Sequence, residues 1–322
     1  MILQSADGAD LMVIAPTSVD MAYGVGDDSE NDMELAMPDG SPAIERGMFV
    51  YVEGTAYGGM LTGIESSGGV TWRGRTWFGL LASKVLVPDG GTGALTVSGN
   101  ANDVLRSLVS RIGLSSVFGV EEKKSVINIS SHTFNMYDDA LNGIFSMLSG
   151  LGGKLKVTHD GNRPVLSAVK AKDWSEDEEF SSDQVDVSVK LDYLPVNHLV
   201  GRGSGTDGER VSVELYMDDD GNVSTSEQAL TGALENSEYY DYTTADEDKL
   251  IEDGTKRLKG YWEKASSVSV TLDASRDLYD VGDTVGGTDP RTGISASAAV
   301  TKKIIKVDGR GRVTVEYETG AI

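Results

Sequence analysis

The sequence predicts a β-rich α+β protein. Glycine is abundant, with 39 glycines against 7 prolines in 322 residues, and the glycines stand between apolar alternations rather than in long tracts. This usage is typical of short strands joined by tight turns, because turns often require a positive φ angle. Residues 1–95 contain short runs of β-branched, methionine and aromatic residues separated by turn signals, and helical spacing begins only after Gly99.

The composition limits the class of protein. A chain of 322 residues is long for one core, so we expect two or three domains. The formal net charge of −23 disfavours tight binding to nucleic acid, because such a surface repels phosphate. The chain has no cysteine, which excludes disulfides and thiolate zinc sites. We find no signal peptide and no apolar run of the ~20 residues that a membrane span needs, so we expect synthesis in the cytoplasm.

The first predicted domain covers residues 1–97. Its expected strands follow one another at close spacing, which is typical of a barrel or a sandwich: 11–14, 32–37, 48–52, 59–64 and 70–87. The last of these carries Trp72, Trp77 and Phe78. We interpret it as one long strand whose aromatic side chains pack on the barrel.

The second predicted domain, residues 98–184, is a small α+β insert. Apolar residues at helical spacing predict a helix over 104–112, capped by Asn102 or Asp103, and a second helix at about 136–149. Two alternating segments around the turn Asp160-Gly161-Asn162 predict a hairpin, 154–158 with 164–169. The acidic stretch 171–184 is interpreted as a surface link.

The third predicted domain covers residues 185–322 and is again rich in strands. Thr244 with Glu247 three residues later forms a capping-box pattern, which predicts a helix at about 245–264. The expected strands are 185–191, 196–200, 210–217, 221–226, 268–272, 294–307 and 313–317. We expect the hairpin Val300–Tyr317 to close a second barrel, so truncation before Val300 should leave an open, aggregation-prone sheet edge.

Two glycine-containing motifs suggest ligand sites and are better explained as turns. Residues 203–208 fit G-x-G-x-x-G, but a strand pattern follows where a dinucleotide site needs a helix. With Gly221 at the sixth position of a calcium loop, Asp218, Asp220 and Glu227 fall at ligand positions. Tyr216 then occupies the first position and cannot supply a carboxylate, so we favour an acidic hairpin tip, and calcium binding by Asp218 and Asp220 stays open.

No catalytic, cofactor-binding or metal-binding residue is predicted. The three histidines, His132, His159 and His198, do not lie at metal-ligand spacing, and no G-x-S-x-G motif occurs. A carboxylate pair for glycoside hydrolysis stays open, because 51 acidic residues offer many pairs. Trp72 or Trp77 could serve a sugar or partner surface, although core packing is favoured.

The order of several motifs resembles a known family. Residues 74–88 read GRTWFGLLASKVLVP, the insert carries YDDAL at 137–141, a later strand ends NHLVGRG at 197–203, and YDVGDTV at 279–285 precedes VTKKIIKV at 300–307. In this order they resemble the hub proteins at the tail tip of long-tailed (siphovirus) bacteriophages, which are related to the baseplate hub of contractile tails.

The resemblance implies a homotrimeric virion structural protein and not an enzyme. It implies two tail-tube-like β-barrels per chain, in 1–97 and 185–322, with strands from 185–205 as candidates to complete the first. The implied partners are distal tail or tail-tube proteins, the tape measure protein and tip or receptor-binding proteins, and DNA passes through the channel only in transit. The alternatives are a β-rich tail-associated cell-wall hydrolase and a carbohydrate-binding adhesin.

Overall fold

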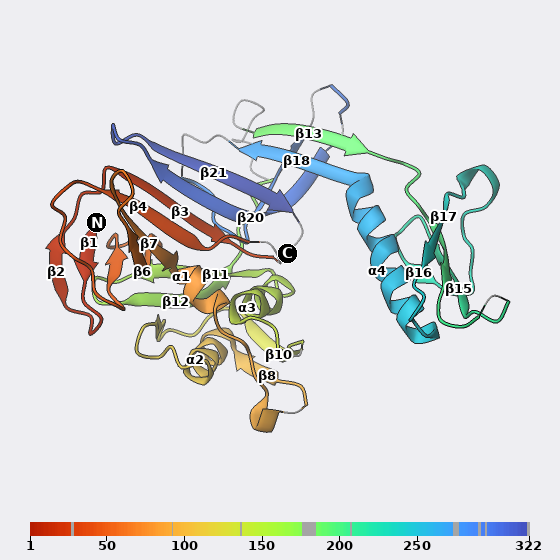
Figure 1. Ribbon diagram of the computed structural model, residues 1–322, viewed down its shortest axis with the longest axis horizontal. Coiled ribbons are helices and arrows are strands. Elements are labelled where there is room, and N and C mark those ends of the chain that lie inside the picture. Colours follow the sequence, from red (N-terminus) through yellow and green to blue (C-terminus); the bar gives the residue numbers. More distant parts are fainter. Residues whose placement is uncertain are drawn as a thin grey trace. The chain divides into compact units, whose positions relative to one another are not determined.

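The computed structural model describes residues 1–26, 29–91, 93–135, 137–175, 185–206, 208–272, 277–288, 291–293 and 295–320 (Figure 1). The chain divides into two compact units: the first contains Met1–Asp186 and Val270–Ile322, and the second contains Val187–Ser269. We describe each unit by itself.

The first unit is built on a ten-stranded sheet in which every neighbouring pair is antiparallel. The order along the sheet is β19-β20-β3-β4-β7-β6-β5-β1-β2, with β21 also paired to β20. The strands are β1 (Ile2–Gln4), β2 (Asp10–Val13), β3 (Ser18–Gly24), β4 (Asp32–Met37), β5 (Phe49–Tyr51), β6 (Gly58–Glu65), β7 (Val70–Thr76), β19 (Thr284–Thr288), β20 (Ser295–Val307) and β21 (Val313–Gly320).

The C-terminal hairpin is present, but it belongs to the N-terminal sheet. β20 and β21 pair from Val307↔Val313 outward, and β20 also pairs with β3 through Ile304↔Ala22. The described strands of this sheet leave open edges at β2, β19 and β21, so the expected barrel closed within residues 185–322 is not formed among them. Alternation along a strand specifies which face is buried but does not specify the neighbouring strand, and this explains why the sequence did not predict the sheet to which the hairpin belongs.

The predicted long strand 70–87 is wrong beyond Thr76. β7 ends there, and helix α1 (Trp77–Ala82) follows directly. Thr76 caps this helix by accepting a hydrogen bond from the backbone N–H of Gly79 at 3.4 Å. The helix buries Trp77, Phe78, Gly79, Leu80 and Leu81. A short apolar run is compatible with either a buried strand or a buried helix, and the cap decides between them.

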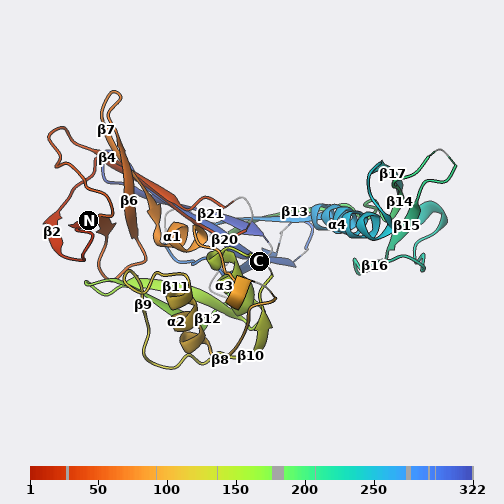
Figure 2. The same cartoon turned by 60° about the horizontal axis from the view of Figure 1, so that its bottom comes forward.

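The insert forms a second layer against the main sheet (Figure 2). It contains β8 (Thr96–Asn100) with β10 (Asn128–Thr133), helices α2 (Ala101–Arg111) and α3 (Ala140–Ser149), and a three-stranded sheet of β11 (Gly153–His159), β12 (Pro164–Lys170) and β9 (Gly119–Val120). The predicted hairpin is confirmed as β11 and β12. A short 3₁₀ turn, η1 (Asp89–Gly91), precedes β8 at the start of the insert.

Both predicted helices of the insert are confirmed, with different starting points. α2 is capped by Asn100, whose side chain accepts from the N–H of Asn102 at 3.2 Å. α3 is capped by Asp139, which accepts from the N–H of Asn142 at 3.0 Å. Tyr137 therefore precedes the helix and is exposed, instead of joining the apolar stripe.

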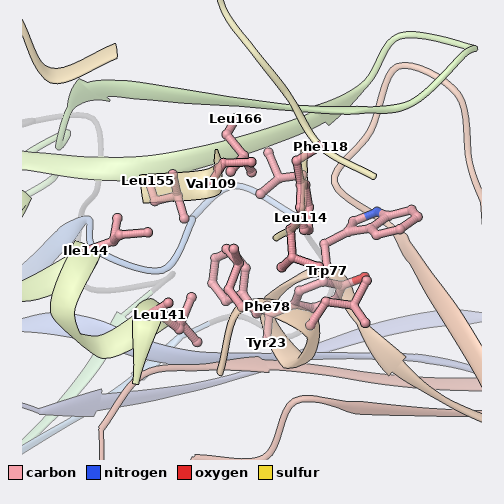
Figure 3. Packing of buried hydrophobic residues seen from close by; sticks show 14 of the residues in the cluster. Tyr23, Trp77, Phe78, Val109, Leu114, Phe118, Leu141, Ile144, Leu155 and Leu166 are labelled. Carbon is pink, nitrogen blue, oxygen red and sulfur yellow. The ribbon is translucent and has the colours of Figure 1, made fainter. Parts of the chain in front are cut away.

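One hydrophobic core connects the main sheet and the insert. Trp77, Phe78 and Tyr23 from the sheet side meet Val109, Leu114 and Phe118 near α2, Leu141 and Ile144 of α3, and Leu155 and Leu166 of the hairpin (Figure 3). Burial of each such side chain contributes about 1.5–3 kcal/mol. The insert is therefore not an independent body within this unit.

Two glycines of β6 provide a matched test of the packing between β6 and β7. A Cβ atom at Gly59 would lie 2.0 Å from the carbonyl oxygen of Arg75, whereas one at Gly63 would have no atom within 4 Å. Gly59→Ala should therefore lower the free energy of unfolding by about 1–3 kcal/mol or more. Gly63→Ala should be neutral or slightly stabilising, because alanine lowers the entropy of the unfolded chain. Urea unfolding of both variants checks this, and equal effects would contradict it.

The second unit packs one long helix on a four-stranded sheet. The sheet order is β16-β15-β14-β17, with β14 (His198–Arg202), β15 (Ser212–Met217), β16 (Val223–Ser224) and β17 (Ser237–Asp241), and β14 and β17 run parallel. Its core contains Leu199, Leu215 and Tyr240 of the sheet and Leu250 and Leu258 of helix α4 (Glu247–Ala265). A 3₁₀ turn, η2 (Gly232–Leu234), precedes β17.

The predicted helix of this unit is confirmed, but its cap differs. The side chain of Asp246, and not that of Thr244, accepts from a helix N–H, that of Lys249 at 3.0 Å. β13 (Val185–Leu191) and β18 (Ser266–Leu272) form a separate two-stranded sheet that contains both unit boundaries. The strand predicted at 185–191 matches β13.

Candidate functional site

Two lysines and three aspartates of the first unit form a partly buried ion cluster. Nζ of Lys154, on β11, lies 2.7 Å from Asp283 Oδ1 and 3.0 Å from Asp280 Oδ2. Nζ of Lys303, on β20, pairs with Asp277 and lies 3.5 Å from Asp280 Oδ1. Both lysine side chains are only 8% exposed. The cluster joins the insert, the C-terminal hairpin and the segment between them, and we call it the ion cluster.

The turn that precedes β19 positions the aspartates. Gly282 has a φ of +94°, and a Cβ atom there would lie 2.7 Å from Cβ of Lys154, so only glycine allows this close approach. The N–H of Gly282 donates to the carbonyl oxygen of Val300 at 2.8 Å, which fixes the turn on β20. Asp283 is 2% exposed and also accepts from the N–H of Lys172 at 2.8 Å and from that of Asp280 at 3.1 Å.

A cavity of about 380 Å³ lies beside the ion cluster. The rings of Tyr23, Tyr57 and Phe78 line it together with Leu155, Val157 and Val281, and Asp277, Asp280 and Lys303 line its polar side. The Tyr57 hydroxyl donates to Asp277. Burial, followed by this hydrogen bond, raises the pKa of Tyr57, and burial also raises the pKa of Tyr23, so both phenols stay neutral.

The ion cluster is suited to holding segments together rather than to proton transfer. Each aspartate is paired with a lysine. A general acid or base needs a pKa near the working pH. Burial opposes ionisation of Asp280, but Lys154 and Lys303 outweigh it and hold the pKa of this carboxyl below its ordinary value.

The lowered pKa of Asp280 predicts a pH dependence of stability. Its contribution is present above the ordinary aspartate pKa of about 3.9 and is lost as the pH falls through the lower native value. Wild type should therefore be more stable than Asp280→Asn near neutral pH, and the difference should shrink below about pH 4. Urea unfolding at several pH values measures this, and a difference that grows on acidification would contradict it.

The outer face of the main sheet is charged. Six carboxylates and four cations lie on this face of strands β3, β4, β6, β7, β20 and β21: Asp20, Asp32, Glu34, Glu65, Glu316, Glu318, Arg73, Arg75, Lys302 and Lys306. Arg73 pairs with Glu34 at 3.1 Å and with Glu65 at 2.9 Å, and Lys306 pairs with Glu316 at 2.8 Å. Burial, followed by the neighbouring carboxylates, raises the pKa of Asp20 despite Lys306. We call this surface the charged sheet face.

The two tryptophans of the 70–87 segment are in the core. Trp72 and Trp77 are both 0% exposed, as the core-packing interpretation requires. A sugar-binding or partner-binding platform formed by either of them is therefore ruled out in this structure. Arg73, which lies between them in sequence, forms ion pairs with Glu34 and Glu65. These pairs do not favour the binding of nucleic-acid phosphates by Arg73.

The histidines lie apart and have different environments. His159 is 0% exposed, stacks on Tyr51 with ring centroids 3.6 Å apart, and has its pKa lowered by burial. His198 is held by Glu235 at 2.7 Å and by Ser237 at 3.0 Å. In the described ranges, no three His, Asp or Glu side chains converge as metal ligands would.

The two glycine motifs are connections between strands. β15 follows the 203–208 motif, and the N–H of Gly203 donates to Val211 at 2.8 Å within a loop. The acidic turn is a hairpin tip in which Asp218 Oδ1 accepts from the N–H groups of Asp220 at 2.9 Å and Asn222 at 2.8 Å. The Asp218 carboxylate thus caps its own turn.

Sequence reasoning missed the ion cluster. Asp280 and Asp283 were noted only as part of a family motif, and Lys154 and Lys303 were not singled out. One signal was available, because Lys303 and the buried Ile305 share a face of β20, and a lysine at such a position needs a carboxylate partner. The sequence does not indicate which of 51 acidic residues supplies it.

Comparison with known proteins gives the class of fold. No profile of a known protein family matches the chain, and no curated protein sequence matches it. Among solved structures, the 43 kDa tail protein of prophage MuSo2 from Shewanella oneidensis is 12% identical with a TM-score of 0.51, over 99% of this chain and 98% of that one. At this identity the similarity shows the fold, so the chain has the fold of a phage tail protein.

Two further structures are similar at lower scores. The tail protein of Neisseria meningitidis MC58 is 11% identical with a TM-score of 0.48, over 99% of this chain and 96% of that one. A chain of the p2 virion baseplate in its activated conformation is 11% identical with a TM-score of 0.44, over 93% of this chain and 87% of that one. The similarity to the MuSo2 tail protein confirms the predicted resemblance to phage tail proteins at the level of fold.

Proposed function

We propose that the protein is a structural hub of a phage tail tip. The observation that carries this proposal is the shared fold with a prophage tail protein, which extends over 99% of this chain and 98% of that one. The motif order seen in the sequence, from residues 74–88 to 300–307, supports the hub among tail components. In this role the chain acts in the virion and is not an enzyme.

The hub is a closed ring of three chains that joins the tail tube to the tip apparatus. Its partners are distal tail or tail-tube proteins, the tape measure protein and the tip or receptor-binding proteins through which the particle attaches to its host. Ring contacts of this type are heterologous, and closure at three depends on the rotation built into the contact. The β-sheets of the three chains would supply the surfaces that the tube subunits meet.

DNA passes through the ring during ejection, and the charged sheet face is the surface suited to line the channel. Its carboxylates outnumber its cations, and adhesion to DNA phosphates requires the opposite balance.

Within the described part of the chain, no helix has both the length and the apolar character needed to cross a membrane.

Light scattering across protein and salt concentrations tests the ring. The charge of −23 per chain opposes assembly, so higher ionic strength should favour the trimer at a given protein concentration. Electron microscopy of tail particles should show a threefold ring at the tip. A protein that stays monomeric at high concentration and high salt, with no ring in particles, would end the hub proposal.

A cell-wall assay separates the hub from the hydrolase alternative. Purified protein is incubated with host cell walls, and released sugar and peptide are measured, with lysozyme as the positive control. The hub proposal expects no release above background. Turnover that a single carboxylate substitution abolishes would support the hydrolase instead.

A further inference from the structure

The sheet of the second unit has one face that α4 does not cover. Leu199, Leu215 and Tyr240 point toward α4, so the alternate residues point away from it. The register places His198 between Tyr216 and Ser237, Val200 between Glu214 and Tyr239, and Arg202 between Ser212 and Asp241. We call these nine residues the open face.

The two tyrosines of the open face are directed along their strands. The Tyr239 hydroxyl donates to Asp241 Oδ2 at 3.2 Å, two residues farther along β17, and the Tyr216 hydroxyl donates to Glu214, two residues back along β15. Each ring therefore runs along its own strand. Tyr239 is 55% exposed. The His198 ring stacks on Tyr216 with centroids 4.5 Å apart and an interplanar angle of 24°.

The open face therefore carries two separated tyrosine rings, one stacked on His198 and one 55% exposed, with polar groups between and beside them. Tyr216 and Tyr239 lie on strands separated by β14, which places them about 10 Å apart across the sheet. Glu214, Asp241 and Arg202 supply acceptors and donors next to the rings. Arg210 pairs with Asp241, with Nη1 at 3.1 Å from Oδ2, and this fixes the carboxylate.

We infer that the open face binds a neutral oligosaccharide. The C–H faces of a sugar ring pack on aromatic rings. Its hydroxyl groups donate hydrogen bonds to carboxylates and accept them from guanidinium groups, and such charge-assisted bonds are the stronger class. The two rings are far enough apart to contact different residues of one extended glycan. The core-located Trp72 and Trp77 do not take part, so this site differs from the one considered from the sequence.

The composition of the open face argues against a protein partner and against a polyanion. Val200 is the only aliphatic residue among the nine, whereas the centre of a protein–protein interface is more apolar than the general surface. Glu214, Asp241 and the nearby Glu235 outnumber Arg202 and Arg210, which disfavours a polyanion. The inference stands on the second unit alone and does not depend on the hub proposal.

Calorimetry and ligand-observed NMR on the full-length protein test the inference. The probes are chitotetraose, cellotetraose, maltotetraose and mannotetraose, with a heparin tetrasaccharide as the polyanion control. At least one neutral probe should bind, and Tyr239→Ala should weaken that binding about tenfold or more through loss of one stacking surface. Tyr239→Phe, which keeps the ring, should retain most of the affinity.

The matched control is Tyr193→Ala, which removes another tyrosine of the second unit. Tyr193 is 85% exposed and lies outside the open face, so its loss should leave binding unchanged. Far-UV circular dichroism confirms that each variant is folded. The inference is overturned if no neutral probe binds at about 10 mM, if Tyr239→Ala binds as wild type does, or if the heparin fragment binds more tightly than every neutral probe.

Discussion

Asp283→Ala is expected to lower the free energy of unfolding by about 3–5 kcal/mol. Asp283 Oδ1 lies 2.7 Å from Nζ of Lys154, and the side chains of these two residues are 2% and 8% exposed. Removal of the carboxylate leaves the buried ammonium group of Lys154 with Asp280 alone. It also leaves the N–H of Lys172, which donates to Asp283 at 2.8 Å, without this acceptor. Urea unfolding followed by circular dichroism measures the loss.

An exposed ion pair provides the control for this prediction. Asp89 pairs with Arg111 at 2.9 Å, but the Asp89 side chain is 90% exposed. Asp89→Ala should therefore change the free energy of unfolding by less than about 1 kcal/mol. The double variant Lys154→Met/Asp283→Ala should lose less than the sum of the single variants, because it removes the unpaired charge as well. Similar effects of Asp283→Ala and Asp89→Ala would show that the ion cluster contributes no more than a surface pair.

Local sequence patterns predicted many of the elements, but not β3 or α1, and they did not predict how distant strands pair. The hairpin of β11 and β12 follows from two alternating segments and a turn signal between them. The pairing of β20 with β3 could not be predicted in this way, because Ile304 and Ala22 are far apart in sequence and many strands have compatible alternation. The expected second barrel was inferred from the local pattern and the resemblance, and it failed at this step.

Helix α1 and the ion cluster show two further limits. The residues of α1 are apolar on all sides, so their spacing does not distinguish a helix from a strand. The requirement for glycine at position 79, where a Cβ atom would lie 2.1 Å from the carbonyl oxygen of Asn31, is a tertiary feature. Lys154 and Asp280 are separated by 126 residues. A pair at such a distance becomes recognisable only once the fold has brought β11 of the insert and β20 of the main sheet to the same aspartate, Asp280.

Trp77→Ala is expected to cost about 3–5 kcal/mol, a large part of the 5–15 kcal/mol typical of a folded domain. Trp77 is 0% exposed and packs against Phe49 of the main sheet at a centroid distance of 5.9 Å. On the insert side it packs against Phe118 at 6.2 Å and His159 at 5.9 Å. The substitution therefore opens a cavity where the two layers meet.

Trp77→Phe and Leu234→Ala are the controls for Trp77→Ala: the first keeps an aromatic ring in the core, and the second shortens an exposed side chain. The Nε1 atom of Trp77 is buried without a hydrogen-bond partner among the described residues, so Trp77→Phe loses no hydrogen bond and should cost less than Trp77→Ala. Leu234→Ala, at a side chain 58% exposed, should stay within about 0.5 kcal/mol of wild type.

Hydrogen exchange shows which elements lose stability in the Trp77→Ala variant. Because the main sheet and the insert share one core, amides of β6 and of β11 should lose protection together in this variant. Loss of protection confined to the insert would show instead that the two layers unfold separately. In that case the ion cluster, and not the aromatic packing around Trp77, would be the main connection between them.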